Sequence, residues 1–148
     1  MNPVRRLLLL APLALGSLEI ARSYGQNLGV TRQEQTQGPV TYLSGGVGEE
    51  EAQVMRAAAA DYPLTLELAT AGQARDPYIA NARVEIRDQR GQAVLNTTTE
   101  GPFLLVRLPS GKYTVDVEWN GAQQHRNVQV SAEKRQHVFV EFPRSADR

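Results

Sequence analysis

The stretch Gly101–Gly121 constrains the fold more than any other part of the chain. Between Lys112 and Trp119, apolar and polar residues alternate one by one, which predicts a β-strand with one apolar and one polar face. Pro109-Ser110-Gly111 predicts a tight turn before this strand, and Asn120-Gly121 predicts a two-residue hairpin turn after it. The residues expected in the core are Tyr113, Val115, Val117 and Trp119.

Short strands separated by turn signals continue through the rest of the chain after residue 64. Phe103–Leu108 is apolar on both faces except at Arg107, so we expect it to lie inside a sheet. About seven strands are predicted, in the segments 64–68, 82–87, 92–97, 103–108, 112–119, around 128–130, and 136–142. This number and spacing favour a mainly β fold, a seven-stranded antiparallel β-sandwich.

Residues 40–63 are expected to form a short strand and one N-terminal α-helix packed on the sandwich. Ser44–Gly48 is rich in glycine, and the helix is predicted from about Glu49 to Ala60, with three glutamates at its positive end. The loop lacks the lysine and hydroxyl of a phosphate-binding loop, so it does not indicate a nucleotide site. Because its apolar stripe is thin, the helix needs support, which we expect through Met55, Ala59 and Tyr62.

The first 23 residues predict a signal peptide. Arg5 and Arg6 precede the apolar run Leu7–Leu15, and small residues suited to cleavage follow. The run is too short for a permanent membrane span. Residues 24–39 have no hydrophobic period and predict a flexible leader. We expect one globular domain over 40–143, with the sandwich in 64–143, and a tail over 144–148, in a periplasmic or secreted protein.

Part of the chain, about 78–142, resembles the carboxypeptidase regulatory-like domains. The resemblance is carried by Val84–Asp88 with Gly91, by Thr99, Gly101 and Phe103, and by Leu108–Val115. It implies a seven-stranded sandwich of the transthyretin (prealbumin-like) type. Residues 42–62 also resemble an element of small secreted proteobacterial proteins. That second resemblance implies export to the periplasm or beyond, and it implies no activity.

The residue types needed for most catalytic chemistry are scarce. The chain has no cysteine and only two histidines, and no Gly-x-Ser-x-Gly nucleophile elbow is present. We therefore expect a protein that is not an enzyme and that has no metal and no cofactor. Sixteen basic residues balance sixteen acidic ones, so the sequence does not indicate a nucleic-acid partner.

We expect the two histidines to lie on the protein surface. If the last two strands form a hairpin through Ser131–Lys134, His125 lies near Val140 and His137 near Val128, so the two histidines are well apart. Metal sites need three or four converging ligands, so we expect solvated surface histidines.

The carboxylates on the polar face of the central strand also have a plain explanation. Asp116 and Glu118 are expected to lie in water and to face Arg83 and Arg87 in weak surface pairs.

Two functions from different classes stay open at this point. The first is a non-catalytic exported module that binds or supports another protein or an envelope component. The alternative is a small-ligand or carbohydrate binder that uses a loop end of the sandwich near Trp119. Trp119 is expected at the rim of the core, and exposed aromatic residues clustered near it would favour the alternative. The sequence does not predict an oligomeric state.

Export with cleavage makes a direct prediction. Mass spectrometry of the protein recovered from the extracytoplasmic fraction should find a new N-terminus between about residues 17 and 26, because both candidate cleavage sites fall in that window. An intact Met1 on that protein would contradict the prediction.

Overall fold

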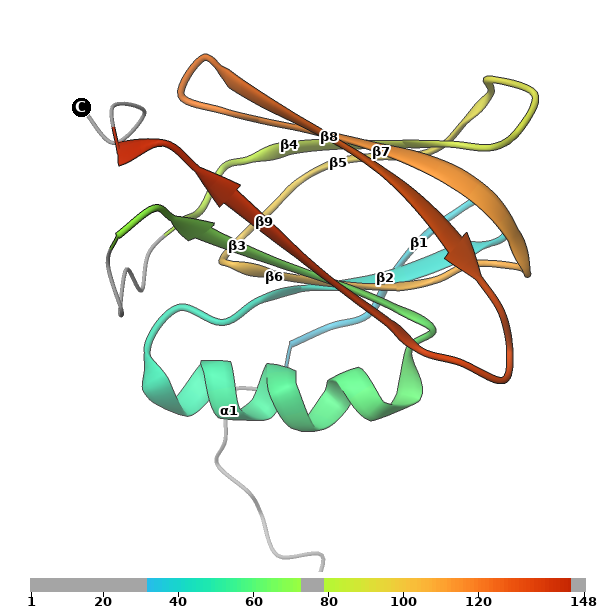
Figure 1. Cartoon of the computed structure of the whole chain (residues 1–148). Helices are drawn as coiled ribbons and strands as arrows, with labels where there is room; N and C mark the ends of the chain where they lie inside the picture. Colours follow the sequence, from blue (N-terminus) through green and yellow to red (C-terminus); the bar gives the residue numbers. More distant parts are fainter. Residues whose placement is uncertain (1–31, 73–78, 145–148) are drawn as a thin grey trace, which may run out of the picture.

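A computed structural model describes residues 32–72 and 79–144 (Figure 1). Within these ranges the chain is mainly β, with two sheets and one α-helix that continues into a 3₁₀ turn. The elements are β1 (Gln35–Gln37), β2 (Val40–Gly45), α1 (Glu49–Ala58), η1 (Ala59–Asp61), β3 (Leu64–Thr70), β4 (Arg83–Arg87), β5 (Ala93–Thr98), β6 (Phe103–Arg107), β7 (Gly111–Trp119), β8 (Ala122–Val130) and β9 (Gln136–Phe142). The predicted signal peptide and all but the first residue of the predicted tail lie outside the described residues.

The two sheets contain nine strands in the described ranges, whereas the sequence predicted about seven. Sheet A has the order β1-β2-β6-β3-β9, and sheet B has the order β5-β4-β7-β8. The seven predicted strands correspond to β3–β9. Two further strands extend sheet A beyond β6: β2, which is the short strand expected in residues 40–63, and β1, which was not predicted. The mainly β class is confirmed, and the count differs because the N-terminal part joins the sheet.

The register predicted for β7 is confirmed. Tyr113, Val115 and Val117 are buried, whereas Asp116 is half-buried and Glu118 is exposed. The hairpin turn that follows has positive φ at both of its central residues, 47° at Asn120 and 80° at Gly121, as a two-residue turn of this kind requires. The turn and the alternation therefore fix the same register, in which β7 lies between β4 and β8.

Both sheets contribute inward-facing side chains to one shared core. Figure 1 shows sheet B above sheet A, and α1 beneath sheet A, on the side away from sheet B. The largest fully buried side chains of this shared core include Leu64, Leu66, Leu68, Ile79, Ile86, Leu95, Leu104 and Phe142. Sheet A is thus the middle of three layers.

Strand β6 is buried on both faces, as its apolar sequence predicted. Leu104 and Val106 belong to the core between the sheets. Phe103 and Leu105 point to the other side and pack in a second cluster with Met55 of α1 and with Tyr62. The helix is therefore docked on sheet A, and it ends two residues earlier than predicted because Ala59–Asp61 tightens into the 3₁₀ turn.

The prediction of a wholly antiparallel fold is wrong at one pair of strands. β9 pairs with β3 in parallel, and its register runs from Leu64↔Gln136 to Thr70↔Phe142. After β8 the chain leaves sheet B and crosses to sheet A, so β9 does not form a hairpin with β8. Alternation of apolar residues sets which face a strand buries, but it carries no information on strand direction.

The prediction of a flexible leader over 24–39 is wrong for its last eight residues. Gln35–Gln37 forms β1, which pairs with β2. The Gln37 side-chain amide bonds to both the N–H and the C=O of Asn96, at 2.8 and 3.1 Å. Tyr42 Oη donates to Gln35 Oε1 at 2.9 Å, and Tyr62 Oη donates to Glu34. Polar side chains fix this segment through hydrogen bonds, so a search for apolar periodicity does not detect it.

Docking of α1 is tested by two adjacent substitutions. Met55 is fully buried in the helix–sheet cluster, whereas Val54 is 41% exposed. Met55→Ala should lower the free energy of unfolding by about 2–5 kcal/mol, because it leaves a cavity. Val54→Ala, the matched control, should change it by less than about 0.5 kcal/mol. Equal effects in urea unfolding would mean that the helix is not docked as described.

Candidate functional site

Trp119, the residue named for a ligand contact, lies in the core. Its side chain is 7% exposed, and its ring packs against Phe142 with centroids 5.6 Å apart. The indole N–H donates to the carbonyl oxygen of Ala80 at 3.2 Å. In the described ranges the exposed large apolar side chains are Val47, Val54 and Phe139, on other elements. The described part of the chain therefore presents no cluster of exposed aromatic residues beside Trp119.

The two histidines lie on different sheets, each beside its own carboxylate. His125 on β8 contacts Asp116 on β7, with Nδ1 and Oδ1 2.6 Å apart. His137 on β9 contacts Glu67 on β3, with Nε2 and Oε2 2.8 Å apart. The hairpin used to place the two histidines is wrong, because β8 and β9 are not paired. Over residues 32–72 and 79–144, no group of three or more His, Asp or Glu residues is arranged to hold a metal ion.

The predicted placement of the two carboxylates opposite arginines holds in register for Glu118 and is wrong for Asp116. Glu118 lies directly across from Arg83, and Asp116 lies across from Glu85. Asp116 binds His125 instead of an arginine, and Arg87 pairs with Glu85 on its own strand. The alternation in the sequence correctly placed these groups on one face of β7. Which group contacts Asp116 depends on the register between β7 and β8, which brings His125 opposite Asp116.

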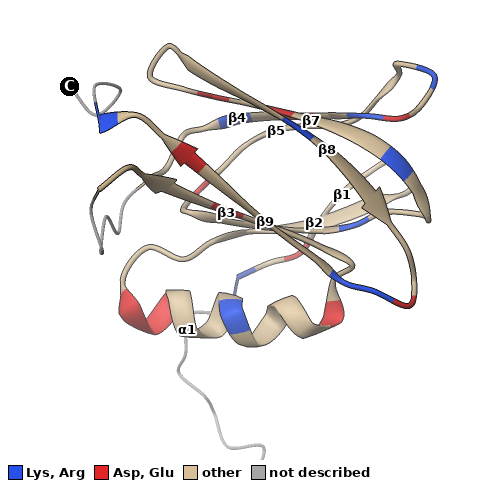
Figure 2. Ribbon diagram, in the orientation of Figure 1, with Lys and Arg blue, Asp and Glu red and all other residues tan. Residues whose placement is uncertain are grey.

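These charged residues line an open groove on the outer face of sheet B. The groove has a volume of about 680 Å³ and is lined by residues of β4, β7 and β8: Arg83, Glu85, Arg87, Asp116, Val117, Glu118, Gln123, Gln124 and His125. Acidic and basic residues are interspersed on this sheet, as Figure 2 shows. Helix α1 covers sheet A and leaves this face open. The groove offers many hydrogen-bond donors and acceptors, because all but one of its lining residues are polar or charged.

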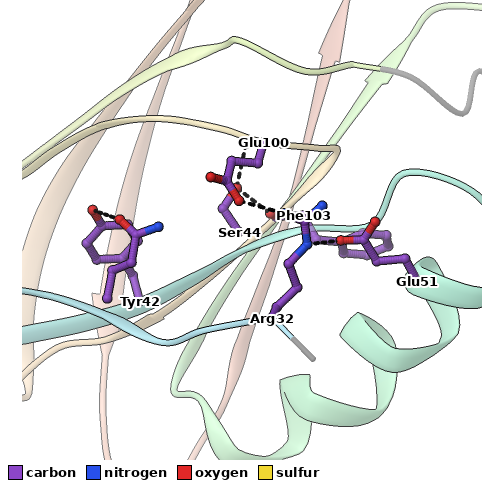
Figure 3. A network of polar contacts seen from close by, with 7 residues as sticks. Arg32, Tyr42, Ser44, Glu51, Glu100 and Phe103 are labelled. Carbon is purple, nitrogen blue, oxygen red and sulfur yellow. Dashed lines mark hydrogen bonds and ion pairs between the residues drawn. The ribbon is translucent and has the colours of Figure 1, made fainter. Parts of the chain in front are cut away.

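A second polar cluster lies where the glycine-rich loop enters α1 (Figure 3). Arg32 forms an ion pair with Glu51 and a second one with Glu100, whose Oε2 is 2.7 Å from Arg32 Nη1. Ser44 Oγ accepts from the N–H of Glu100 at 2.8 Å and donates to the carbonyl of Phe103 at 3.3 Å. These bonds join the start of the described chain, β2, α1 and the β5–β6 connection.

The carboxylate of Glu51 occupies the place that an anion would take in a glycine-rich loop. It accepts the backbone N–H groups of Gly46 and Val47 as well as the guanidinium of Arg32. The hydrogen bond from Arg32 is the main cause that lowers the pKa of Glu51, against the opposing effect of burial. The loop is therefore satisfied from within the chain, and its role is to anchor the helix. Only the acidic helix start was visible in the sequence; the contact with Arg32 spans 19 residues and was missed.

The outer edge of β8 is the longest open strand edge of sheet B. The two-residue turn directs the main-chain N–H of Ala122 toward β7. Because main-chain groups alternate in direction along an antiparallel strand, every second residue, beginning with Gln123, directs its N–H and C=O away from β7. The residues whose N–H and C=O groups point outward along this edge are Gln123, His125, Asn127 and Gln129. β8 pairs with β7 alone among the strands of the described chain. An open edge of this kind is a template for another extended chain.

The opposite edges of both sheets are shorter or partly covered. β5, at the far side of sheet B, has the main chain of Asn96 bonded to the Gln37 side chain. β1, at the far side of sheet A, has only three residues. The remaining long edge is β9, which carries the exposed Phe139. β8 and β9 are therefore the two edges that the described residues leave open.

Comparison with known proteins adds no relative: no protein-family model matches the chain, and no curated protein matches it significantly. Across the residues that the structure describes, no helix is long and apolar enough to cross a membrane.

The Arg32–Glu51 pair predicts a specific dependence of stability on pH. Because the pKa of Glu51 lies below its ordinary value of 4.5 in the folded protein, its contribution is present above pH 4.5 and is lost as the pH falls through the lowered pKa. Glu51→Gln should cost about 1–3 kcal/mol at pH 7, and the difference from the parent should shrink in acid.

The control is Glu50→Gln, one residue earlier on the same helix, at an exposed position. It should change stability by less than about 0.5 kcal/mol at pH 7. Urea unfolding at pH 7 and at several values below 4.5 measures both. A difference between the parent and Glu51→Gln that does not shrink in acid would contradict the assignment.

Proposed function

We propose that the protein is an exported, non-catalytic module that binds another protein of the cell envelope along the open edge of β8 and the polar groove beside it. An extended segment of the partner would pair with β8, and its side chains would reach the groove on sheet B. Main-chain hydrogen bonds supply affinity in such strand addition, and the flanking pocket supplies specificity. The observation that carries the proposal is the coincidence of a nine-residue open strand with a polar groove.

The chemistry of the groove supports a polar, extended partner segment. His125 contacts Asp116, and Arg87 forms an ion pair with Glu85, so acidic and basic groups lie side by side in the groove. Arg83 and the exposed Glu118 add one charge of each sign. A partner with alternating polar residues can replace these exposed surface pairs at small cost, because such pairs contribute little in water.

The proposal also includes a fold type and a location. The seven strands β3–β9 support membership of the carboxypeptidase regulatory-like group with a prealbumin-like sandwich, to which β1, β2 and α1 are additions. The tight turn at Leu108–Val115 is compatible with this, since Tyr113 Oη donates back to the carbonyl of Pro109 at 2.7 Å. The signal-like N-terminus supports a periplasmic or secreted location.

A sugar or small-ligand site near Trp119 is the weaker proposal. Its indole faces the core, and its N–H is already bonded to Ala80. A stacking platform needs an exposed ring face, and a 7% exposed side chain does not offer one. No observation in the described part of the chain favours this second function.

The partner edge is tested by site-specific photo-crosslinking in cells that produce the full chain. A photoreactive residue at Gln123 should give covalent adducts with a different protein, whereas the same residue at the exposed Val54 on α1 should not. Asn127→Pro in the same chain removes an outward N–H without breaking the bonds to β7, so adducts from position 123 should fall at least about tenfold.

Two results would contradict the proposal. One is an adduct yield at position 123 that Asn127→Pro leaves unchanged in a protein with an unaltered melting temperature. The other is equal labelling from position 54. An adduct between two copies of this chain counts against a foreign partner at β8, because its mass identifies it as self-association.

A further inference from the structure

The free edge of β9 presents a short, regular set of unpaired main-chain groups. Its parallel pairing with β3 includes the bonds from Gln136 N to Pro63 O and from Ala71 N to Phe142 O, both 2.8 Å. In a parallel ladder, alternate residues direct both N–H and C=O to the same neighbour. The even-numbered residues of β9 therefore face β3, and His137, Phe139 and Glu141 direct their main-chain groups away from it.

The side chains of the same three residues are also exposed. Phe139 is 51% exposed, the most exposed large apolar side chain of the described residues, and His137 and Glu141 flank it. Helix α1 packs on β2 and β6 and does not cover Phe139, as the members of the helix–sheet cluster show. A long edge strand with an exposed aromatic residue at its centre is a surface that folded proteins normally cover.

The sequence of β9 is self-complementary about Phe139. Reading outward from that residue, Val138 and Val140 are the same residue type, and His137 and Glu141 are a base and an acid. If a second strand of this sequence lies antiparallel with Phe139 opposite its own copy, His137 lies opposite Glu141 of the partner subunit. Opposite charges across an antiparallel pair are favourable, and like charges are not.

We propose that the protein forms a two-fold symmetric dimer in which two β9 strands pair antiparallel about Phe139. Sheet A of one copy then continues into sheet A of the other. The pairing satisfies the outward N–H and C=O of three residues on each strand, about six main-chain hydrogen bonds in all. It also brings the two exposed Phe139 rings together. His137 already contacts Glu67 through Nε2, which leaves Nδ1 for Glu141 of the partner subunit.

A second β9 fits this edge better than the other edges of the chain do. β1 is only three residues long, and β5 already bonds to Gln37. The outward residues of β8 are polar and provide no apolar partner for Phe139. An antiparallel pair of identical strands also closes the assembly at two copies, since it uses the same edge of both and leaves no growing end.

This inference concerns a surface and a partner that the proposed function does not use. β8 lies in sheet B and β9 in sheet A, so the two edges can be disabled separately. Asn127→Pro removes an outward N–H on β8, and Phe139→Pro removes one on β9, and neither N–H takes part in the ladder to the neighbouring strand. Each variant is therefore the matched control for the other.

The oligomeric state is the first test. Light scattering coupled to size exclusion, on protein purified from cells that express the full chain, should give twice the mass of one chain for the parent and for Asn127→Pro. Phe139→Pro should be monomeric or should dimerise at least about tenfold more weakly, with a circular-dichroism spectrum like that of the parent. A parent that is monomeric at about 100 micromolar, a concentration at which a dimer with a micromolar Kd would be mostly formed, overturns the proposal.

Cysteine crosslinking tests the register and does not depend on the proline variant folding. The chain has no cysteine, so an introduced one reacts without background. Paired residues of this type have Cα atoms about 5.5 Å apart, within the range of a disulfide. Phe139→Cys should therefore form a disulfide-linked dimer under mild oxidation, and Asn127→Cys should not.

Mixing two single variants completes the register test. His137→Cys and Glu141→Cys should crosslink to each other much more than either does to itself. Homodimers of His137→Cys in excess over the mixed product, or equal crosslinking of Asn127→Cys, would show a different contact and overturn the proposal.

Discussion

Burial of β6 on both of its faces is the constraint on which the rest of the structure depends. Leu104 and Val106 need sheet B on one side, and Phe103 and Leu105 need α1 on the other. A strand with two apolar faces cannot lie at a surface without exposing one of them. Sheet A therefore becomes the middle layer, and the helix, marginal by itself, gains its stability from the cluster around fully buried Met55.

The close fit around this middle layer explains the polar cluster at its end. Gly101 lies so near the backbone of Gly45 that a Cβ there would overlap it. That approach lets Ser44 bridge the connection between β5 and β6, and Arg32 then closes the cluster between Glu51 and Glu100. Two glycines of the loop that resembles a ligand loop in the sequence also serve close packing, because a Cβ at Gly45 would overlap Glu51 and one at Gly46 would overlap the ring of Phe103.

Local rules predicted the parts of the fold that depend on neighbouring residues. The β7 register, the Asn120-Gly121 turn and the interior position of β6 each follow from a few consecutive residues. The β1 strand, the parallel direction of β9 and the contact of Arg32 with Glu51 depend on residues far apart in the chain, and no periodicity encodes them. The same limit applied to the site: Trp119 is buried, as its phase suggested, and the open edges emerged only from the strand order.

The two open edges differ in chemistry in a way that suits different partners. On β8 the outward residues are glutamine, histidine and asparagine beside a polar groove, a surface that is well solvated when it is alone. On β9 an exposed phenylalanine lies between a base and an acid. The phenylalanine ring is costly to leave in water, and the strand is complementary to an antiparallel copy of itself. An edge that is stable when bare suits a partner that comes and goes, whereas one that is costly to expose suits a permanent contact. By its chemistry, the β9 edge therefore suits a lasting pair of chains, and the β8 edge suits a transient partner.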